Sequence, residues 1–414
     1  MNKLKKIIAS AAFALFAVAP AFAQGGSNYS MYGIGDIHNN LSARYEGMGG
    51  VSIAVPSEYG INLKNPAMWS FVESTRIQAG YHYNQRRAEY GDDLIDQSNA
   101  GVNQILGLFA IDSARGIAVS FGVLPYSSIN YYIQKNDQYL DDQFDFYGES
   151  IYTGSGGITE GYIGLASEIT NNFRLGLQAD MFFGTMSQAT RTLFYDGINQ
   201  EQTNDRDDQV SGSGLKFGFS YEPVKNLFVG AYYEKILKLN IDSKISYDGQ
   251  LNSVTNDSTY TRKYELDLPD SYGVGIALKT GKFLIAADYS CQDFSDFKNE
   301  ANSLAEFKNS QTVAIGLSRF GNKSYRADFF DKITYNFGLG YKQLYYSVNG
   351  EDVNEIFGSV GFDWNTVGSM MVNLAFTGGI RGKNSGGLLK ETFLRMNVNI
   401  SLGETWFRPF KPDY

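Results

Sequence analysis

The stretch "FRLGLQADMFF", Phe173 to Phe183, alternates strictly between apolar residues and residues that are polar or small. Its apolar positions are Phe173, Leu175, Leu177, Ala179, Met181 and Phe183, and the positions between them include Arg174, Gly176, Gln178 and Asp180. Successive side chains of a β-strand point to opposite faces. This period of two therefore predicts a strand with one face in an apolar phase.

The same alternation recurs from Glu73 onward in about 14 runs. They cover residues 73–87, 103–111, 115–126, 157–169, 172–185, 209–222, 226–247, 259–279, 281–291, 309–320, 331–346, 355–364, 369–380 and 391–403. An even number of antiparallel strands is typical of bacterial outer-membrane barrels. We therefore predict an all-β fold in which residues 73–403 form a transmembrane antiparallel β-barrel.

The second face of the runs consists mostly of Gly, Ala, Ser and Asn, as in "TYNFGLGYK", Thr334 to Lys342. A soluble sandwich, which alternation alone would also fit, normally carries Lys, Glu and Thr on its wet face. Small side chains suit the crowded interior of a closed barrel. Closure also removes the unpaired strand edges that a bilayer does not tolerate.

The connections between runs alternate in length. Short ones such as "DSAR", "TNN" and "KTGK" are followed by long polar ones such as "DGINQEQTNDRDDQ". Two connections break this rule: "GNKSYRADFF" after the tenth run is long, and the one after the eleventh run is only of modest length. Short periplasmic turns and long outer loops are typical of outer-membrane barrels, and an even strand count puts both termini in the periplasm. An aromatic content of 15% agrees with aromatic girdles at the two interfaces.

The first residues have the pattern of a secretory signal peptide. Three lysines precede an apolar run, and Ala21-Phe22-Ala23 is a small-x-small cleavage site, so we expect residues 1–23 to be removed. Gln24 rather than Cys follows the site, which predicts no lipid anchor. The expected location is the outer membrane of a Gram-negative-type bacterium, with outer-membrane lipid and lipopolysaccharide as surroundings.

Composition excludes several classes of function. Signal removal takes three lysines with it and lowers the formal net charge from −9 to −12, which argues against nucleic acid as a partner. A single cysteine, Cys291, and two histidines predict neither an intrachain disulfide nor a His/Cys metal site. No phosphate loop or G-x-S-x-G elbow is present, so we expect no enzyme, no catalytic residues and no cofactor.

The segment before the first run, residues 24–72, has no strand pattern. A barrel of this size needs either a water channel or a plug, and this segment is expected to fold inward as a plug. Gly47, Gly49 and Gly50 permit close backbone approach. At Asn65-Pro66 the proline fixes its own φ and biases Asn65 away from helix, which predicts an abrupt turn.

"GMGGVSIA" (47–54), followed by Asn65, Pro66 and Ala67 just before the first run, resembles the hatch of FadL-type outer-membrane transporters of fatty acids and other hydrophobic compounds. "YEPVKNLFVGAYYEKI" (221–236) and "LDLPDSYGVGIAL" (266–278) are similar to two barrel segments of that family. The resemblance implies that Gly47, Gly49, Gly50, Asn65, Pro66 and Ala67 belong to a gating hatch. It also implies a hydrophobic small-molecule ligand that leaves sideways into the bilayer through a kinked strand.

Gly122 and Pro125 in the third run are candidates for that kink, because Pro125 removes a ladder hydrogen bond. Alternatively, Pro125 ends the strand at its loop. Arg86 and Arg87 at the top of the first run are expected to be exposed at the outer rim, against lipopolysaccharide phosphates or an anionic ligand head group. The sequence does not identify ligand-binding residues.

Residues 404–414, "ETWFRPFKPDY", depart from the resemblance, because Pro409 and Pro412 prevent a regular strand. We expect a periplasmic tail that could contact a periplasmic protein.

Transport of hydrophobic, fatty-acid-like molecules through a plugged barrel with lateral release is the first functional hypothesis. The alternative is a non-transporting FadL-like subunit or shuttle of a secretion or surface-assembly machine. The third is a general porin.

Overall fold

The computed structural model describes residues 26–38, 42–141, 144–194, 201–251, 254–255, 257–298, 305–324, 326–366, 369–404 and 406. The predicted signal peptide and nearly all of the predicted C-terminal tail lie outside the described residues. Within the described part of the chain, no helix is long and apolar enough to cross a membrane.

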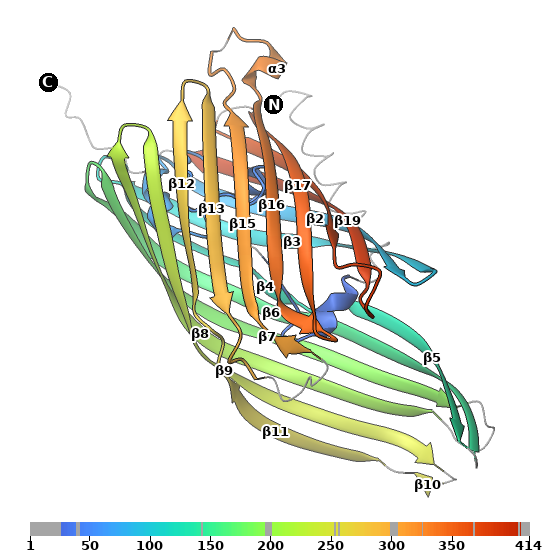
Figure 1. The fold of residues 1–414 in the computed structure, drawn as a ribbon. Helices are drawn as coiled ribbons and strands as arrows, with labels where there is room; N and C mark the ends of the chain where they lie inside the picture. The colour runs from blue at the N-terminus through green and yellow to red at the C-terminus, as the bar shows by residue number, and fades with distance from the viewer. Residues whose placement is uncertain are drawn as a thin grey trace, which may run out of the picture.

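Fourteen strands form a closed antiparallel barrel, as predicted (Figure 1). They are β2 (Thr75–Tyr90), β3 (Asp93–Asp112), β4 (Ile117–Ser128), β6 (Phe144–Thr170), β7 (Phe173–Phe194), β8 (Gln202–Val224), β9 (Leu227–Leu251), β12 (Ser271–Thr280), β13 (Phe283–Asp293), β15 (Asn309–Arg319), β16 (Thr334–Val348), β17 (Glu351–Asn365), β18 (Met371–Arg381) and β19 (Lys390–Glu404). Each pairs with the next in this order, and β19 pairs with β2.

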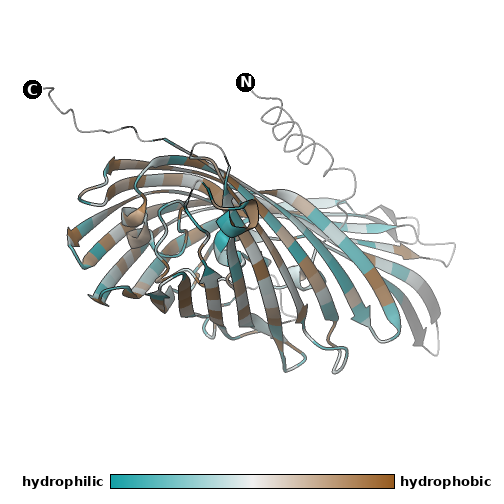
Figure 2. Cartoon of the chain, turned by 90° about the horizontal axis from the view of Figure 1, so that it is seen from above, coloured by the Kyte–Doolittle hydropathy of each residue, from teal (hydrophilic) through white to brown (hydrophobic). Residues whose placement is uncertain are grey.

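The apolar face of the strands is the outer face. In β7, Leu175, Met181 and Phe183 are exposed, whereas Gln178 and Asp180 are buried inside. Figure 2 shows the resulting alternation of hydrophobic and hydrophilic segments along the strands. An outer wall of this kind is stable only against lipid, because it would otherwise expose a continuous apolar surface to water.

Several strands continue well beyond the barrel wall at one end. There β5 (Tyr131–Asp141), β11 (Ser258–Leu266) and the two-residue β10 (Val254–Thr255) extend the sheet formed by the long ends of β6 to β9 (Figure 1). The run predicted over 259–279 is therefore wrong as a single strand. Asp267 to Asp270 interrupt it, because Pro269 has no N–H to donate to a ladder.

The short connections β3–β4, β6–β7, β8–β9 and β12–β13 lie at the other end of the barrel, together with α3 (Phe329–Lys332), which interrupts the connection between β15 and β16 (Figure 1). Two further short turns, β2–β3 and β16–β17, lie at the end with the sheet extension. Two-residue β14 (Glu306–Phe307) pairs with β16 at the same end as these two turns. By the usual topology of such barrels, the end where strands extend beyond the wall is extracellular, and the opposite end is periplasmic.

Residues 26–38 and 42–72 lie inside the wall and form η2 (Asn28–Met31), β1 (Asp36–Ile37), α2 (Ala43–Glu46) and η3 (Pro66–Phe71). Most of their apolar side chains are buried, including Met48, Val51 and Trp69. We call residues 26–38 the N-terminal arm, which reaches toward the extracellular end, and residues 42–72 the lower segment, which lies toward the periplasm.

Candidate functional site

The lower segment is seated against wall positions that lack side chains. A Cβ added to Gly338 of β16 would overlap the backbone of Met48 and Gly49. Gly49 has a φ of 73°, and its N–H donates to Ser359 Oγ at 2.8 Å. Gly47 has a similar close approach to Gly361 of β17. Glycine is therefore required on both sides of this contact.

The predicted turn at Asn65 is another point of attachment. The Asn65 amide donates to the carbonyls of Ile53 at 2.8 Å and Phe219 at 2.9 Å, and its oxygen accepts from Ala67 N at 3.1 Å. Pro66 begins η3, where its missing N–H is not needed. The sequence-predicted hatch residues thus divide between separate contacts with the wall. Gly47 and Gly49 lie near β16 and β17, Gly50 lines a small pocket with residues of β13 and β15, and Asn65, Pro66 and Ala67 lie near β7 and β8.

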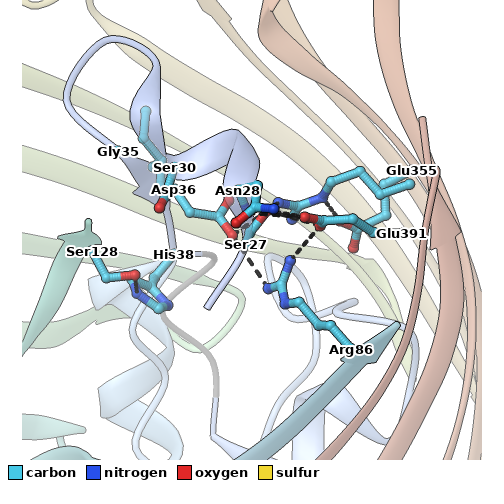
Figure 3. Close-up of polar contacts among 12 residues, drawn as sticks. Ser27, Asn28, Ser30, Gly35, Asp36, His38, Arg86, Ser128, Glu355 and Glu391 are labelled. Atoms are coloured by element: carbon cyan, nitrogen blue, oxygen red, sulfur yellow. Dashed lines mark hydrogen bonds and ion pairs between the residues drawn. The ribbon is translucent and has the colours of Figure 1, made fainter. Parts of the chain in front are cut away.

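The N-terminal arm is held by a network of buried charges (Figure 3). Asp36 lies 3.0 Å from Arg381 and 3.4 Å from Arg86. Arg381 also pairs with Glu355 at 2.6 Å, and Arg86 pairs with Glu391 at 2.9 Å. The prediction that Arg86 is exposed at the rim is wrong. It points inward and is 6% exposed, whereas Arg87 points outward and pairs with Asp96.

Uncharged groups of the arm complete this network. The Ser27 hydroxyl donates to the carboxylate of Glu391 and lies 2.9 and 2.8 Å from its two oxygens. The N–H of Asn28 donates to the same carboxylate at 3.0 Å (Figure 3). Because Glu391 is fully buried, these donors replace the water that its charge would otherwise need. The network therefore ties the arm to β2, β17, β18 and β19.

Burial and charge shift the acid–base properties of the segment. Burial raises the pKa of Asp36. The positive charges of Arg381, Arg86 and Lys342 lower this pKa by more than burial raises it, so the net pKa lies well below its usual value. Burial lowers the pKa of His38 to about 4, and it raises the pKa of Glu46 to about 7. Asp36 therefore stays ionised in the seated arm, and His38 stays neutral.

Below the arm lies a polar cavity of about 110 Å³. Its lining includes Asp36, His38, Glu46, His82, Lys342 and Arg395. Several buried polar atoms at its surface, such as Gln104 Nε2 and Asn84 Oδ1, have no hydrogen-bond partner within the described structure. A polar cavity of this volume has room for water, with these atoms as hydrogen-bond partners.

Aromatic side chains fill the lumen around the arm. Tyr29 stacks with Tyr346 at 6.2 Å between ring centroids, and Phe294 packs against Tyr345 at 4.6 Å. The Tyr345 hydroxyl accepts from Ile34 N at 3.1 Å and lies 2.7 Å from the Gly35 carbonyl, to which it donates. The arm thus takes up the apolar space in the extracellular half of the lumen.

The ladder between β3 and β4 ends within the wall. Its last pair is Ile105 with Val123, one residue after Gly122, and the register of β4 against β6 shifts after Pro125. Beyond this point β1 pairs with β4 through Asp36–Ser128 and Ile37–Ser127. The arm therefore supplies two backbone pairs where β3 no longer does, and the polar cavity borders the break at Pro125 and Gln104.

A separate cluster in the lumen contains Glu160, Asp180 and Glu234, whose ligand atoms lie within 4.8 Å of one another. Carboxylates this close could hold a metal ion, but Lys216 lies 3.2 Å from Glu234 and 3.8 Å from Glu160. Its ammonium group already supplies a positive charge to the cluster. The sequence analysis missed these residues, although each lies on the inward face of a predicted strand.

A family model described as BamG matches residues 3–413 of the chain. Among solved structures, the monoaromatic hydrocarbon channel CymD is similar with a TM-score of 0.60 at 13% identity, over 91% of this chain and 100% of CymD. The toluene transporter TodX of Pseudomonas putida gives a TM-score of 0.60 at 14% identity, over 91% of this chain and 100% of TodX.

A Pseudomonas aeruginosa FadL homologue gives a TM-score of 0.60 at 11% identity, over 88% of this chain and 98% of its own. No curated protein sequence matches the chain. At such low identity, these likenesses concern the fold alone. They confirm that the barrel has the FadL-type architecture that the sequence motifs resemble.

Proposed function

The chain belongs to the BamG family, and we propose that it works as a closed, non-transporting barrel of the outer membrane, as a subunit of a secretion or surface-assembly machine. The observation that carries this proposal is a lumen filled by the chain's own N-terminal arm and lower segment. Membership of a family with a Bam designation agrees with an assembly role. The C-terminal tail from Glu404 onward is a candidate contact for a periplasmic partner.

The character of the lumen supports a closed barrel. A hydrophobic solute needs a concave site that is lined mainly by apolar side chains. The aromatic space that could provide one is occupied by Tyr29, Ile34 and their partners, and the cavity below the arm is small and polar. Opening a path would also separate Asp36 from Arg381 and Arg86, and leave buried charges without partners.

Transport of hydrophobic small molecules with lateral release is the second candidate. Two observations favour it. The β3–β4 ladder ends at Val123, near the candidate kink at Gly122 and Pro125, and the fold resembles that of proteins described as toluene transporters. For this function the arm would have to leave β4, which would extend the break between β3 and β4 into the polar cavity.

Cross-linking in living cells, followed by affinity purification in mild detergent, tests the proposed function. We expect a partner in stoichiometric amount, and depletion of the protein should lower the amounts of other outer-membrane or surface proteins. An unrelated barrel with the same tag is the control, and a chain ending at Glu404 tests the tail.

Uptake of labelled toluene and of a labelled fatty acid into depleted cells discriminates between the two candidates. An assembly subunit leaves both uptake rates unchanged. Slower uptake that the wild-type gene restores, without any stoichiometric partner, would support transport instead and overturn the proposed function.

A further inference from the structure

We infer that the periplasmic mouth of the barrel is a docking cup for an acidic, aromatic-containing segment of a periplasmic protein. This inference rests on the proposed function and names the surface and the partner chemistry. The cup is a cavity of about 860 Å³ between the lower segment and the wall. That volume lies within the range of about 300–1,000 Å³ typical of protein binding pockets.

Basic residues gather around this cup. Its lining contains Arg44, Lys279, Lys282, Lys323 and Lys332, against Glu58, Glu73 and Asp363. The whole chain has the opposite balance, with 35 lysines and arginines against 44 acidic residues. The surplus of positive charge is therefore local to the mouth, and it would attract an acidic partner.

Part of this charge is already neutralised by contacts across the cup. Lys323 pairs with Glu58 at 2.8 Å, and Arg44 pairs with Asp363 at 3.5 Å. No carboxylate lies within ion-pair distance of Lys279 or Lys282 in the described part of the chain. Their ammonium groups, on and beside the turn between β12 and β13, are the cations that remain for a partner's carboxylates.

Aromatic rings form the apolar part of the cup. Lys279 Nζ lies 5.3 Å from the centre of the Phe320 ring, and Phe71 meets Phe228 edge to face at 5.7 Å. Tyr59 and Phe320 are half-buried and line the same space. A half-buried ring beside a cation can pack against an apolar side chain of a partner while its neighbour binds a carboxylate.

The position of the cup favours a peptide over a lipid head group. Asp363 and Phe228 are buried on the inner side of the wall, and Arg44, Tyr59 and Phe71 belong to the lower segment. The cup therefore faces the lumen and the periplasm rather than the bilayer. Because the lower segment supplies part of the lining, a partner docked here contacts the barrel only in its closed form.

Fluorescence anisotropy with the purified full-length protein in detergent tests the inference. The probe is a labelled Gly/Ser-based peptide that carries glutamates and phenylalanines, and its control has lysines in place of the glutamates. We expect the acidic peptide to bind in a salt-dependent manner and the basic one not to bind. The double variant K279E/K282E should raise the Kd at least about tenfold, because it replaces attraction by repulsion.

The matched control is K244E/K263E on the extracellular sheet extension, which changes the net charge equally but far from the cup. A second variant, Phe320→Ser, removes an aromatic ring without any change of charge and should also weaken binding. Equal affinity of K279E/K282E and the wild type, or no binding of the acidic peptide, would overturn the cup as docking site.

This outcome is separate from that of the proposed function. A partner that co-purifies with the K279E/K282E variant as well as with the wild type would leave the assembly role intact and move the contact elsewhere. If the peptide binds as expected and no cellular partner is found, the cup is a peptide site but the assembly role fails.

Discussion

Arg381 is the residue on which the arm depends most directly. It is 1% exposed and lies between Asp36 of the arm and Glu355 of β17. Arg381→Ala would leave both carboxylates buried without this partner, at a cost of about 3–5 kcal/mol. We expect the barrel to remain folded and the arm to become accessible to protease, measured as cleavage of the first residues of the mature chain.

Lys383→Ala is the control for this prediction. Lys383 pairs with Glu351 at 2.9 Å, but both side chains are about half exposed, so the pair contributes no more than about 1 kcal/mol. Its protease resistance should equal that of the wild type. If the Arg381→Ala arm is equally resistant, the ion network does not hold the arm in place.

His38 and Glu46 should give the seating of the N-terminal segment opposite dependences on pH. Seating lowers the pKa of His38 from 6.5 to about 4, so the seated segment favours the neutral imidazole. The free energy by which His38 stabilises the seated segment is therefore lost as the pH drops from 6.5 to about 4. The pKa of Glu46 rises from 4.5 to about 7, so its contribution is lost as the pH rises through that range. The two effects oppose each other in the wild type.

Single variants separate these effects. With Glu46→Gln, acidification from pH 7 to pH 4.5 should loosen the segment more than in the wild type, because the opposing term is gone. With His38→Gln, the same acidification should tighten it relative to the wild type. Protease cleavage across this pH range measures both. Identical profiles for the three proteins would contradict the prediction.

At the scale of elements, the wall and the lower segment meet through glycines, and a matched pair tests that contact. Gly338→Ala places a methyl group into the backbone of Met48 and Gly49, whereas the methyl group of Gly358→Ala points outward beside Leu339. We expect Gly338→Ala to unseat the lower segment and to raise ion conductance in a planar bilayer. Gly358→Ala should stay closed, and equal conductance would argue against a glycine-dependent seat.

The strands could be predicted because their physical cause is local. An outer face in lipid and an inner face of small residues impose a period of two on each strand, so thirteen of the fourteen barrel strands overlap the predicted runs in order. The exception is the run over 259–279. There the alternation of the sequence continues from β11 into β12, so the two strands read as one run. In the structure, β12 pairs with the barrel part of β9, and β11 pairs with the part of β9 that extends beyond the barrel. The starts of β3, β6 and β8 were predicted too late, because their extracellular ends lie in polar sequence that was predicted to form loops.

The ion network could not be predicted in the same way. Its charges come from positions far apart in sequence, such as Asp36 and Arg381, and only the closed ring brings them together. Alternation predicted an inward face for each strand, but it could not distinguish a partnered charge on that face from a hydrated one. Arg86 was wrongly predicted to be exposed, because a charged residue near the end of a strand can point either to the rim or into the lumen.

At the scale of the whole molecule, closure of the lumen is a measurable property. The wild-type protein in a planar bilayer should show little conductance, because the lower segment and the arm together occupy the bore. Deletion of residues 26–72 removes both and leaves a fourteen-stranded wall whose interior is wider than its own side chains can fill. We expect large, stable openings from the deletion variant.

The arm and the lower segment need not contribute equally to this closure. Deletion of residues 26–38 alone removes the aromatic and ionic filling of the extracellular half but leaves the glycine-seated lower segment in place. Because that segment still blocks the periplasmic half, conductance should remain low, whereas the polar cavity becomes open to the outside. Full conductance from this shorter deletion would mean that the arm alone closes the barrel, and that the lower segment is held in place through the arm.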